Sequence, residues 1–419
     1  MNSKDAEVYK DVHMKILLLS PKYPPNMGGT EIYVKSLAEC LSRLNYNVIV
    51  CMLGQEDISS IKKNENLTIY RMSGILQKIP ILFFKSVSRT ASLPIPDPTF
   101  IKKLSDIVNN QKPDVIHAHG WMLYSAIYLK KKFNIPLIAT IHDYGFICPT
   151  KTLMKGTIIC KKCFTNDCIH CSKEQFGLTA SLFRYLGIIS QKNNLKNVDR
   201  FIAVSPFVKD MHSKYIDKNR ITVIPNFYDA NEKDAMTNND SIILPDDFIL
   251  FVGSLTHYKG ADILINAFNM INDGNTKLVM CCKKSLKEEY KISGNILIFE
   301  DAPRSLVLEA YSRCRFVVIP STLPETFGLV AIEAMCYKKA IIASATGGLI
   351  NIVDDRSTGI LVPPNNPKEL ATAINFLIRN SDIALSMGVA GYNKFQLHYT
   401  PDVVLPKIQD VYESMKNIA

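Results

Sequence analysis

Two glutamates, Glu325 and Glu333, border a segment that could bind a phosphate group. An apolar run at 315–321 predicts a strand, and the apolar residues that follow Gly328 predict a helix. The first turn of such a helix has backbone N–H groups without intrahelical partners and carries the positive end of the helix dipole, which favours phosphate. The phosphate-binding residues predicted there are Phe327, Gly328, Leu329 and Val330.

The two carboxylates suggest what lies on either side of that phosphate. Glu325 precedes the helix, where it could accept hydrogen bonds from hydroxyl groups, and Glu333 lies further along, where it could hold a ribose diol. Gly328 would let a ligand approach the backbone because it has no Cβ. This arrangement suits a nucleotide-sugar. The competing interpretation is a surface helix that carries two exposed acids.

Two glycine-containing loops could contact further phosphates. Gly28 and Gly29 lie between the first predicted strand and a helix, so their N–H groups could cradle a phosphate, although a glycine pair is more often a turn. Gly253 and Ser254 end another predicted strand, and Lys259 stands at the start of the helix that follows. A lysine at that point could neutralise a leaving pyrophosphate, or be an ordinary solvated side chain.

Histidines lie in two neighbouring predicted strands. His142 ends the strand predicted from Pro136, where its imidazole could donate to a sugar hydroxyl or stabilise developing charge. An isolated histidine at this point would more often only cap the strand end. His117 and His119 alternate to the same face of the preceding strand, and one of them could be buried structure.

Strand-like and helical patterns alternate nearly from end to end, which predicts an α/β protein with parallel sheets. The predicted strands begin at Lys15, Asn47, Asp114, Pro136, Arg200, Ile221, Phe248, Lys277, Asn295, Arg315 and Ala340. The predicted division is a tail at 1–13, a first domain at 14–227, a linker at 228–241, a second domain at 242–400 and a closing helix at 401–419.

The stretch PETFGLVAIEAM, with its E-x7-E pattern, resembles the signature of retaining glycosyltransferases of family 4. The resemblance extends over nearly the whole chain from residue 14. It implies the GT-B fold, in which two doubly wound, Rossmann-like domains face each other across a cleft and the last helix crosses back to the first domain. It also implies His142, Glu325 and Lys259 as catalytic residues, with a nucleotide-diphosphate sugar of the UDP or GDP type as donor.

Retention of configuration and the acceptor class are implied by the family alone. The acceptor would be a glycan or a lipid-linked molecule in polysaccharide or glycoconjugate biosynthesis. The family commonly has an arginine directly after Gly253, where this chain has Ser254, so Lys259 or another cation must contact the pyrophosphate instead. No D-x-D sequence occurs, so no catalytic metal is expected.

Five cysteines form a Cys-rich insertion at 148–171. Two C-x2-C pairs in a reducing compartment suggest a structural Zn²⁺ site. Similar segments in some family 4 members imply a different ligand set, made of Cys148, Cys160, Cys168 and Cys171. That set would leave Cys163 unbound, whereas the pairs alone would include it. A loop of unligated thiols is the remaining interpretation.

Composition describes a globular protein of about two domains, with 419 residues of which 47% are hydrophobic and 21% charged. No apolar run reaches the ~18 residues that a membrane span needs. The polar N-terminus is unlike a secretory signal, so a cytoplasmic location is expected. The net charge of +10 suits an anionic donor or the inner face of a membrane. Segment 74–89 mixes apolar and basic residues and could contact that membrane or be buried.

Two other functions remain open from the sequence. A sugar-nucleotide epimerase could share the two-domain shape, and detection of glycosyl transfer would separate it from a transferase. A zinc-bearing nucleic-acid-binding protein would explain the cysteines and the net charge, and would show salt-sensitive binding. However, the chain has no recognisable nucleic-acid module, and this second function leaves the glutamate pair and Lys259 unexplained, so no nucleic-acid partner is expected.

Overall fold

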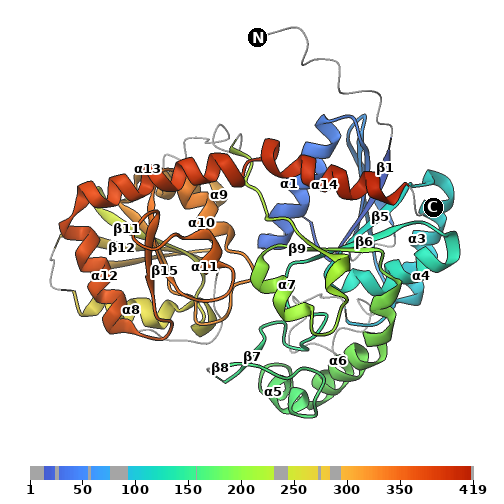
Figure 1. Cartoon of the computed structure of the whole chain (residues 1–419), viewed down its shortest axis with the longest axis horizontal. Coiled ribbons are helices and arrows are strands. Elements are labelled where there is room, and N and C mark those ends of the chain that lie inside the picture. The colour runs from blue at the N-terminus through green and yellow to red at the C-terminus, as the bar shows by residue number, and fades with distance from the viewer. Residues whose placement is uncertain are drawn as a thin grey trace, which may run out of the picture. The chain divides into compact units, whose positions relative to one another are not determined.

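The structure is a computed structural model that describes residues 14–23, 28–54, 58–75, 93–156, 158–230, 244–271, 275–283 and 294–416. These residues form two compact units. Unit 1 takes its described residues from Met1–Val204, Val208–Ile224 and Leu405–Ala419, and unit 2 takes them from Ser205–Phe207 and Pro225–Val404. Each unit is built on one sheet with helices packed on it (Figure 1).

Unit 1 contains an eight-stranded sheet in the order β10-β9-β6-β5-β1-β2-β4-β3. All neighbouring strands are parallel except the edge pair β3–β4, which is antiparallel. The strands are β1 Lys15–Ser20, β2 Asn47–Leu53, β3 Ser59–Asn64, β4 Leu67–Met72, β5 Val115–His119, β6 Leu137–Ile141, β9 Arg200–Ala203 and β10 Ile221–Val223. The sequence prediction lacks β3 and β4.

The helices of unit 1 connect these strands. They are α1 Gly29–Arg43, α3 Pro98–Gln111, α4 Leu123–Phe133, α5 Asp167–Phe176, α6 Leu178–Gln191 and α7 Pro206–His212, with short 3₁₀ turns η2 Gly120–Met122, η3 Lys192–Asn197 and η4 Lys218–Arg220. A two-stranded ribbon, β7 Met154–Lys155 with β8 Ile158–Ile159, precedes α5. The Cys-rich insertion therefore contains the ribbon and the first half of α5.

Unit 2 contains a six-stranded parallel sheet in the order β13-β12-β11-β14-β15-β16. The strands are β11 Phe248–Ser254, β12 Lys277–Lys283, β13 Ile296–Glu300, β14 Phe316–Ile319, β15 Ala340–Ser344 and β16 Gly359–Val362. The helices are η6 His257–Lys259, α8 Ala261–Asn269, α9 Arg304–Arg313, α10 Leu329–Cys336, α11 Leu349–Ile352, α12 Pro367–Arg379 and α13 Ser381–His398. The sequence prediction lacks β16.

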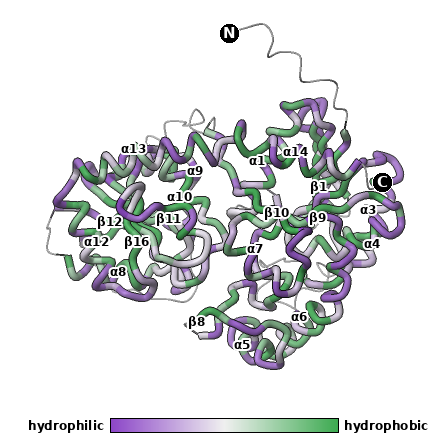
Figure 2. The backbone as a smooth tube through the Cα atoms, in the orientation of Figure 1, coloured by the Kyte–Doolittle hydropathy of each residue, from purple (hydrophilic) through white to green (hydrophobic). Residues whose placement is uncertain are grey.

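Burial of the central strands explains both sheets. Strand β5 and strand β14 are buried at every residue, as expected of parallel strands that have helices on both faces. The central strands are correspondingly hydrophobic in colour in Figure 2. In unit 2, Ile249, Leu278 and Ile342 belong to one core cluster that also includes residues of α8 and α12. Each sheet therefore provides a packed core from which the loops at its carboxyl edge extend.

The closing helix, α14 Pro401–Met415, belongs to unit 1 from Leu405 onward. The hydroxyl of Tyr412, a fully buried residue, lies 2.8 Å from Nδ1 of His117 on β5. Gln409 donates a hydrogen bond of 3.1 Å from Nε2 to the hydroxyl of Tyr46. The end of the chain therefore packs on the sheet formed by its beginning.

Several segments named in the sequence analysis lie outside the described residues. These are the tail at 1–13, residues 231–241 of the predicted linker and residues 76–89 of the segment considered for membrane contact. Among the helices that the structure describes, none is long and apolar enough to span a bilayer.

Candidate active site

In unit 2 the strand order reverses between β11 and β14, which lie side by side although β12 and β13 come between them in sequence. Open parallel sheets bind ligands outside the carboxyl ends of strands at such a switch point. The loop after β11 contains Lys259, and the loop after β14 contains Glu325. The fold thus brings two residues predicted as catalytic to one place.

Hydrogen bonds and close packing join these two loops. Thr322 donates from its backbone N to the carbonyl of Tyr258 at 3.1 Å, and from its hydroxyl to the carbonyl of His257 at 2.9 Å. Gly260 has a φ of +71°, and a Cβ at this position would lie 1.9 Å from the carbonyl oxygen of Pro320. Only glycine allows this approach. The backbone next to Lys259 is therefore fixed against the end of β14.

Lys259 and Glu325 form an ion pair in this structure. The ammonium of Lys259 donates to Oε1 of Glu325 at 2.5 Å, and the hydroxyl of Ser321 donates to the same oxygen at 2.6 Å. Burial acts to raise the pKa of Glu325, but the charge and hydrogen bond of Lys259 and the bond from Ser321 outweigh it and hold the pKa below its usual value. Glu325 is therefore ionised at neutral pH.

A second glycine pair, Gly347 and Gly348, supports the Glu325 loop from behind. The backbone N of Gly348 donates to the carbonyl of Glu325 at 2.6 Å. Gly347 has a φ of +57°, and a Cβ there would lie 2.2 Å from that same carbonyl oxygen. The sequence analysis missed this pair. The signal was available, since two glycines follow the predicted strand that begins at Ala340.

Gly328 stands at the start of α10, as the sequence predicts, and adopts a φ of +118°. A Cβ there would lie 2.7 Å from Cδ2 of Leu349, so a larger residue would disturb both its own backbone and the next helix. Phe327 is 4% exposed, while Leu329 and Val330 are partly exposed. The ring of Phe327 is thus packed inside unit 2 at the start of α10, whereas the side chains of Leu329 and Val330 partly reach solvent.

Glu333 lies one turn further along α10 and is 4% exposed. Its Oε1 accepts a hydrogen bond of 2.7 Å from Nη2 of Arg304, and its Oε2 accepts one of 2.8 Å from the hydroxyl of Tyr311. Arg304 and Tyr311 come from α9 and were not predicted as site residues. Each carboxylate oxygen can accept a further hydrogen bond, so the fixed Glu333 retains capacity for a diol.

Gly253 and Ser254 end β11, and both are partly exposed. The carbonyl of Ser254 accepts a hydrogen bond of 2.8 Å from the N of Thr256, which turns the chain toward Lys259. A Cβ on Gly253 would lie 3.1 Å from the ring of Phe251. These two residues shape the loop that carries Lys259.

In unit 1, three predicted histidines come together at the carboxyl ends of β5 and β6. Nδ1 of His119 lies 2.9 Å from Nε2 of His142, and the two rings stack at 5.1 Å. The ring of His117 lies 4.5 Å from that of His119, and its Nε2 contacts Oγ1 of Thr140 at 2.7 Å. Tyr33 of α1 packs edge-on against His142 at 5.0 Å.

Burial keeps these imidazoles neutral. It lowers the pKa of His142 to about 4, although the nearby Asp143 acts in the opposite direction, and burial followed by the charge of His142 lowers the pKa of His117 to about 3. The pKa of His119 lies well below its usual value for the same reason. Nε2 of His119 is buried without a hydrogen-bond partner among the described residues. Each neutral ring can donate one hydrogen bond and accept one.

Gly28 and Gly29 stand at the start of α1, as predicted, with Gly28 in an extended conformation. A Cβ on Gly28 would lie 2.4 Å from Oε2 of Glu31. A carboxylate in the first turn is favoured by the helix dipole, as a phosphate would be. An anionic ligand at this helix end would therefore have to displace the side chain of Glu31.

The four cysteines implied as metal ligands line one cavity of about 640 Å³ beside β7, β8 and α5. They are Cys148, Cys160, Cys168 and Cys171, whereas Cys163 is not among the lining residues. Sγ of Cys171 donates to the carbonyl of Met154 at 3.0 Å, and that of Cys160 to the carbonyl of Lys162 at 3.1 Å. Within the described residues, no group of three or more histidines, cysteines or acids is placed to hold a metal ion.

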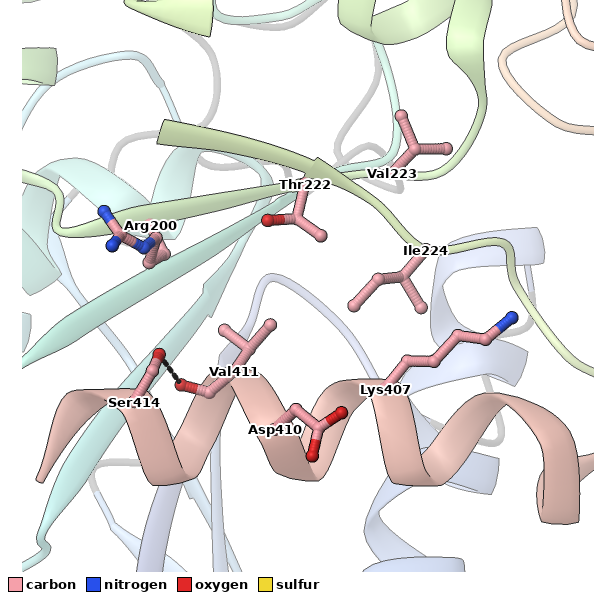
Figure 3. Close-up of a pocket in the computed structure, with 8 residues that line it drawn as sticks. All are labelled: Arg200, Thr222, Val223, Ile224, Lys407, Asp410, Val411 and Ser414. Atoms are coloured by element: carbon pink, nitrogen blue, oxygen red, sulfur yellow. Dashed lines mark hydrogen bonds between the residues drawn. The ribbon is translucent and has the colours of Figure 1, made fainter. Parts of the chain in front are cut away.

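Another cavity, of about 320 Å³, lies between β9, β10 and α14 in unit 1 (Figure 3). Arg200 and Thr222 line it from the strands, and Lys407 and Asp410 line it from the helix. Ser414, also in its wall, donates its hydroxyl to the carbonyl of Val411 at 2.7 Å. This cavity lies at the sheet edge and contains none of the predicted site residues.

Comparison with known proteins gives matches over most of the chain. The family model described as Glycosyltransferase Family 4 matches residues 27–232, and the model of Glycosyl transferases group 1 matches residues 233–394. The chain is 28% identical to an uncharacterised glycosyltransferase of Methanocaldococcus jannaschii, over 96% of this chain and 99% of that protein.

Solved structures share the fold. A sucrose-phosphate synthase of Thermosynechococcus elongatus superposes with a TM-score of 0.75 at 21% identity, covering 97% of this chain and 100% of that one. An Anabaena protein crystallised with UDP-glucose superposes with a TM-score of 0.65 at 16% identity, covering 96% and 100%.

Proposed function

The chain belongs to the family 4 glycosyltransferases, which have the GT-B fold, and we propose that it transfers a sugar from a nucleotide-diphosphate donor to a glycan or lipid-linked acceptor. The proposal includes retention of configuration at the anomeric carbon. Family membership favours this function over an epimerase or a nucleic-acid-binding protein. The observation that supports it best is the pairing of Lys259 with Glu325 at the switch point of unit 2.

The ion pair provides one group for each part of the donor. As the bond from the anomeric carbon to the leaving oxygen breaks, negative charge develops on the pyrophosphate, and the ammonium of Lys259 with the first turn of α10 can stabilise it. Lys259 is 38% exposed along its side chain, so it can turn from Glu325 to a phosphate. Glu325, thus released, keeps its hydrogen bond from Ser321 and can accept hydrogen bonds from sugar hydroxyls.

The nucleotide would lie along α10. Glu333, held by Arg304 and Tyr311, is proposed to accept hydrogen bonds from the ribose diol, while Gly328, Leu329 and Val330 contact the phosphates through their backbone. The UDP-glucose complex of the Anabaena protein supports a nucleotide-sugar donor, and the base is proposed to be of the UDP or GDP type.

His142 is proposed to contact the transferred sugar in neutral form. Its hydrogen bond with His119 fixes the orientation of the ring, and burial keeps the ring unprotonated at physiological pH. A neutral imidazole suits hydrogen bonding to a hydroxyl, whereas a permanent cation there would attract any anion.

A structural Zn²⁺ at the Cys-rich insertion is a separate proposal. The donor chemistry fits, because four thiols face one cavity and thiolates are preferred zinc ligands. Four such ligands would fill a tetrahedral site and order the insertion, with no role in the chemical step. Binding would have to draw the four sulfurs together and release their protons.

Nucleotide binding tests the main proposal directly. The thermal midpoint of the purified protein is measured with nucleoside diphosphates and nucleotide sugars, because a ligand that binds only the folded state raises stability. A stabilising nucleotide sugar is then incubated with candidate acceptors, and the product is analysed for anomeric configuration. The absence of stabilisation by any nucleotide, together with the absence of transfer, would refute the proposal.

Elemental analysis of protein prepared under reducing, chelator-free conditions tests the zinc proposal. Stoichiometric zinc that is lost in Cys168→Ser but kept in Cys163→Ser supports the four-cysteine set. Loss in both variants would favour the two C-x2-C pairs. Protein without stoichiometric metal would end the proposal and leave the transferase assignment intact.

A further inference from the structure

The region from β7 to η3, Met154–Asn197, combines a net positive charge with exposed apolar side chains; we call it the basic lobe. Its 44 residues contain seven basic and two acidic side chains, a net charge of +5, which is half of the +10 of the whole chain. Six of the basic residues are exposed lysines: Lys155, Lys161, Lys162, Lys173, Lys192 and Lys196. In Figure 1, β7, β8, α5 and α6 lie together at one end of unit 1.

The same lobe exposes large apolar side chains. Of the 17 exposed large hydrophobic residues found in the described part of the chain, seven belong to the lobe, which makes up about a tenth of the sequence. Two lie on β8, and five lie on α6: Leu178, Leu182, Phe183, Leu186 and Ile189, which are 57%, 43%, 49%, 51% and 38% exposed.

The five apolar residues of α6 form a continuous face. At 3.6 residues per turn, these five side chains project from the helix axis within an arc of about 140°. Leu178 lies at one limit of this arc and Phe183 at the other. The polar residues inside this arc are only Thr179 and Ser190, which are uncharged. Lys192 follows directly at the helix end. A helix with an apolar outer face and a lysine at its end has features of an interfacial membrane helix.

The opposite face of α6 anchors the helix to unit 1. Arg184 donates to the carbonyl of Pro149 at 3.2 Å and stacks on the ring of Phe176 at 3.7 Å. A Cβ on Gly187 would lie 2.9 Å from the ring of Pro94. These buried residues hold α6 on unit 1 through the face opposite to the apolar one.

We propose that the outer face of α6 and the lysines of the basic lobe dock on an anionic lipid bilayer. The apolar side chains would enter the boundary between headgroups and acyl chains, and the lysines would contact anionic headgroups. A protein partner would need its own compensating acidic surface, whereas the bilayer supplies both the apolar phase and the negative charge. The inference deepens the proposed function and rests on it, since it favours a membrane-bound acceptor.

Vesicle flotation of the full chain tests this docking. Wild-type protein is expected to float with vesicles of phosphatidylcholine and phosphatidylglycerol, more weakly with phosphatidylcholine alone, and more weakly as salt increases. The double variant Leu182→Ser/Leu186→Ser should bind roughly tenfold or more weakly, because two side chains no longer enter the bilayer.

A matched control comes from α13 in unit 2. Leu385 and Val389 are 64% and 50% exposed, so Leu385→Ser/Val389→Ser removes similar exposed apolar groups from a helix outside the lobe. This control should float like the wild type. Equal flotation of the α6 variant and the wild type, or failure of the wild type to float with anionic vesicles, would overturn the proposal.

Two further measurements distinguish membrane docking from self-association and from a defect in nucleotide binding. Light scattering that shows a wild-type dimer dissociated by the α6 substitutions, without flotation, would assign this face to self-association and overturn membrane docking. Nucleotide-dependent thermal stabilisation should be the same in the wild type and the α6 variant. Its absence from the wild type as well would count against the proposed transferase, independently of the vesicle result.

Discussion

The candidate site of unit 2 and the histidine cluster of unit 1 occupy similar places at the ends of parallel strands. However, the groups in unit 2 are charged and those in unit 1 are neutral. In unit 2, Lys259 and Ser321 keep Glu325 ionised in spite of its burial. In unit 1, burial keeps His117 and His142 neutral. Unit 2 therefore presents an ion pair whose ammonium suits a phosphate and whose carboxylate suits hydroxyls, whereas unit 1 presents uncharged hydrogen-bonding groups.

The sharpest test of this difference is the removal of charge from unit 2. Glu325→Ala should lower kcat by roughly 10²–10³-fold, because the preorganised group that we propose to contact the transferred sugar is lost. Affinity for the nucleoside diphosphate, measured by calorimetry, should remain within a few-fold. Glu309, a partly exposed acid on α9 that pairs with Arg313, provides the control variant Glu309→Ala. Wild-type turnover in Glu325→Ala would remove Glu325 from the site.

Removal of the partner cation should have the next largest effect. Lys259→Ala should cost roughly 3 kcal/mol of transition-state stabilisation, about a hundredfold in kcat/KM. The variant should also weaken binding of the diphosphate, which Glu325→Ala should not. The control Lys338→Ala changes a lysine outside the loops that form the site. If Lys259→Ala loses only a few-fold, another cation serves the pyrophosphate.

The glycine pair behind Glu325 tests whether rigidity matters as well as charge. Gly347→Ala places a Cβ 2.2 Å from the carbonyl of Glu325 and puts alanine at a positive φ, which by itself costs about 1–2 kcal/mol. Transfer should fall roughly tenfold as Glu325 shifts. Gly294→Ala is the matched control, because no atom of the described residues lies within 4 Å of its added Cβ. Equal activity of the two variants would show that the loop tolerates movement.

The neutral histidines predict a smaller, pH-dependent effect on stability. A histidine whose pKa is lowered to about 4 in the folded state binds a proton more readily when unfolded, so stability is fully present above about pH 6.5 and is lost as the pH falls toward 4. Each such histidine contributes at most about 1.4 kcal/mol per pH unit in this window. Denaturant unfolding of the wild type and of His142→Asn between pH 7 and pH 5 measures how the free energy of unfolding depends on pH. If the free energy of unfolding changes equally with pH in both proteins, His142 is not a neutral, buried residue.

Strand prediction succeeded where burial leaves a clear apolar signal and failed where it does not. Residues such as Phe316, Val317 and Val318 form an apolar run because β14 has helices on both sides, and the run identifies the strand. The edge strand β3 is exposed along most of its length, and the short β16 begins with Gly359, so neither produced such a run. Solvent relaxes the demand for apolar residues in β3, whereas the edge strands β10 and β13 keep an apolar run and were predicted.

The residues of the candidate site likewise divide into those that the sequence predicted and those that it did not. Glu325, Gly328 and Glu333 could be named from the sequence because they share one strand–loop–helix segment with a recognisable pattern. Arg304 and Tyr311, which hold Glu333, lie 29 and 22 residues away on another helix. No local pattern distinguishes them from other residues of α9.

The sequence by itself therefore determined the α/β class, the family and most of the polar residues proposed to act on the donor. It could do so because the apolar periodicity of buried strands and the local pattern of a helix start both occur within short segments. Only the tertiary structure decided that Lys259 pairs with Glu325, that Gly347 and Gly348 support the loop, and that the histidines are neutral. These properties depend on which strands become neighbours and on how far each group is removed from water, and both are set by contacts between residues distant in the chain.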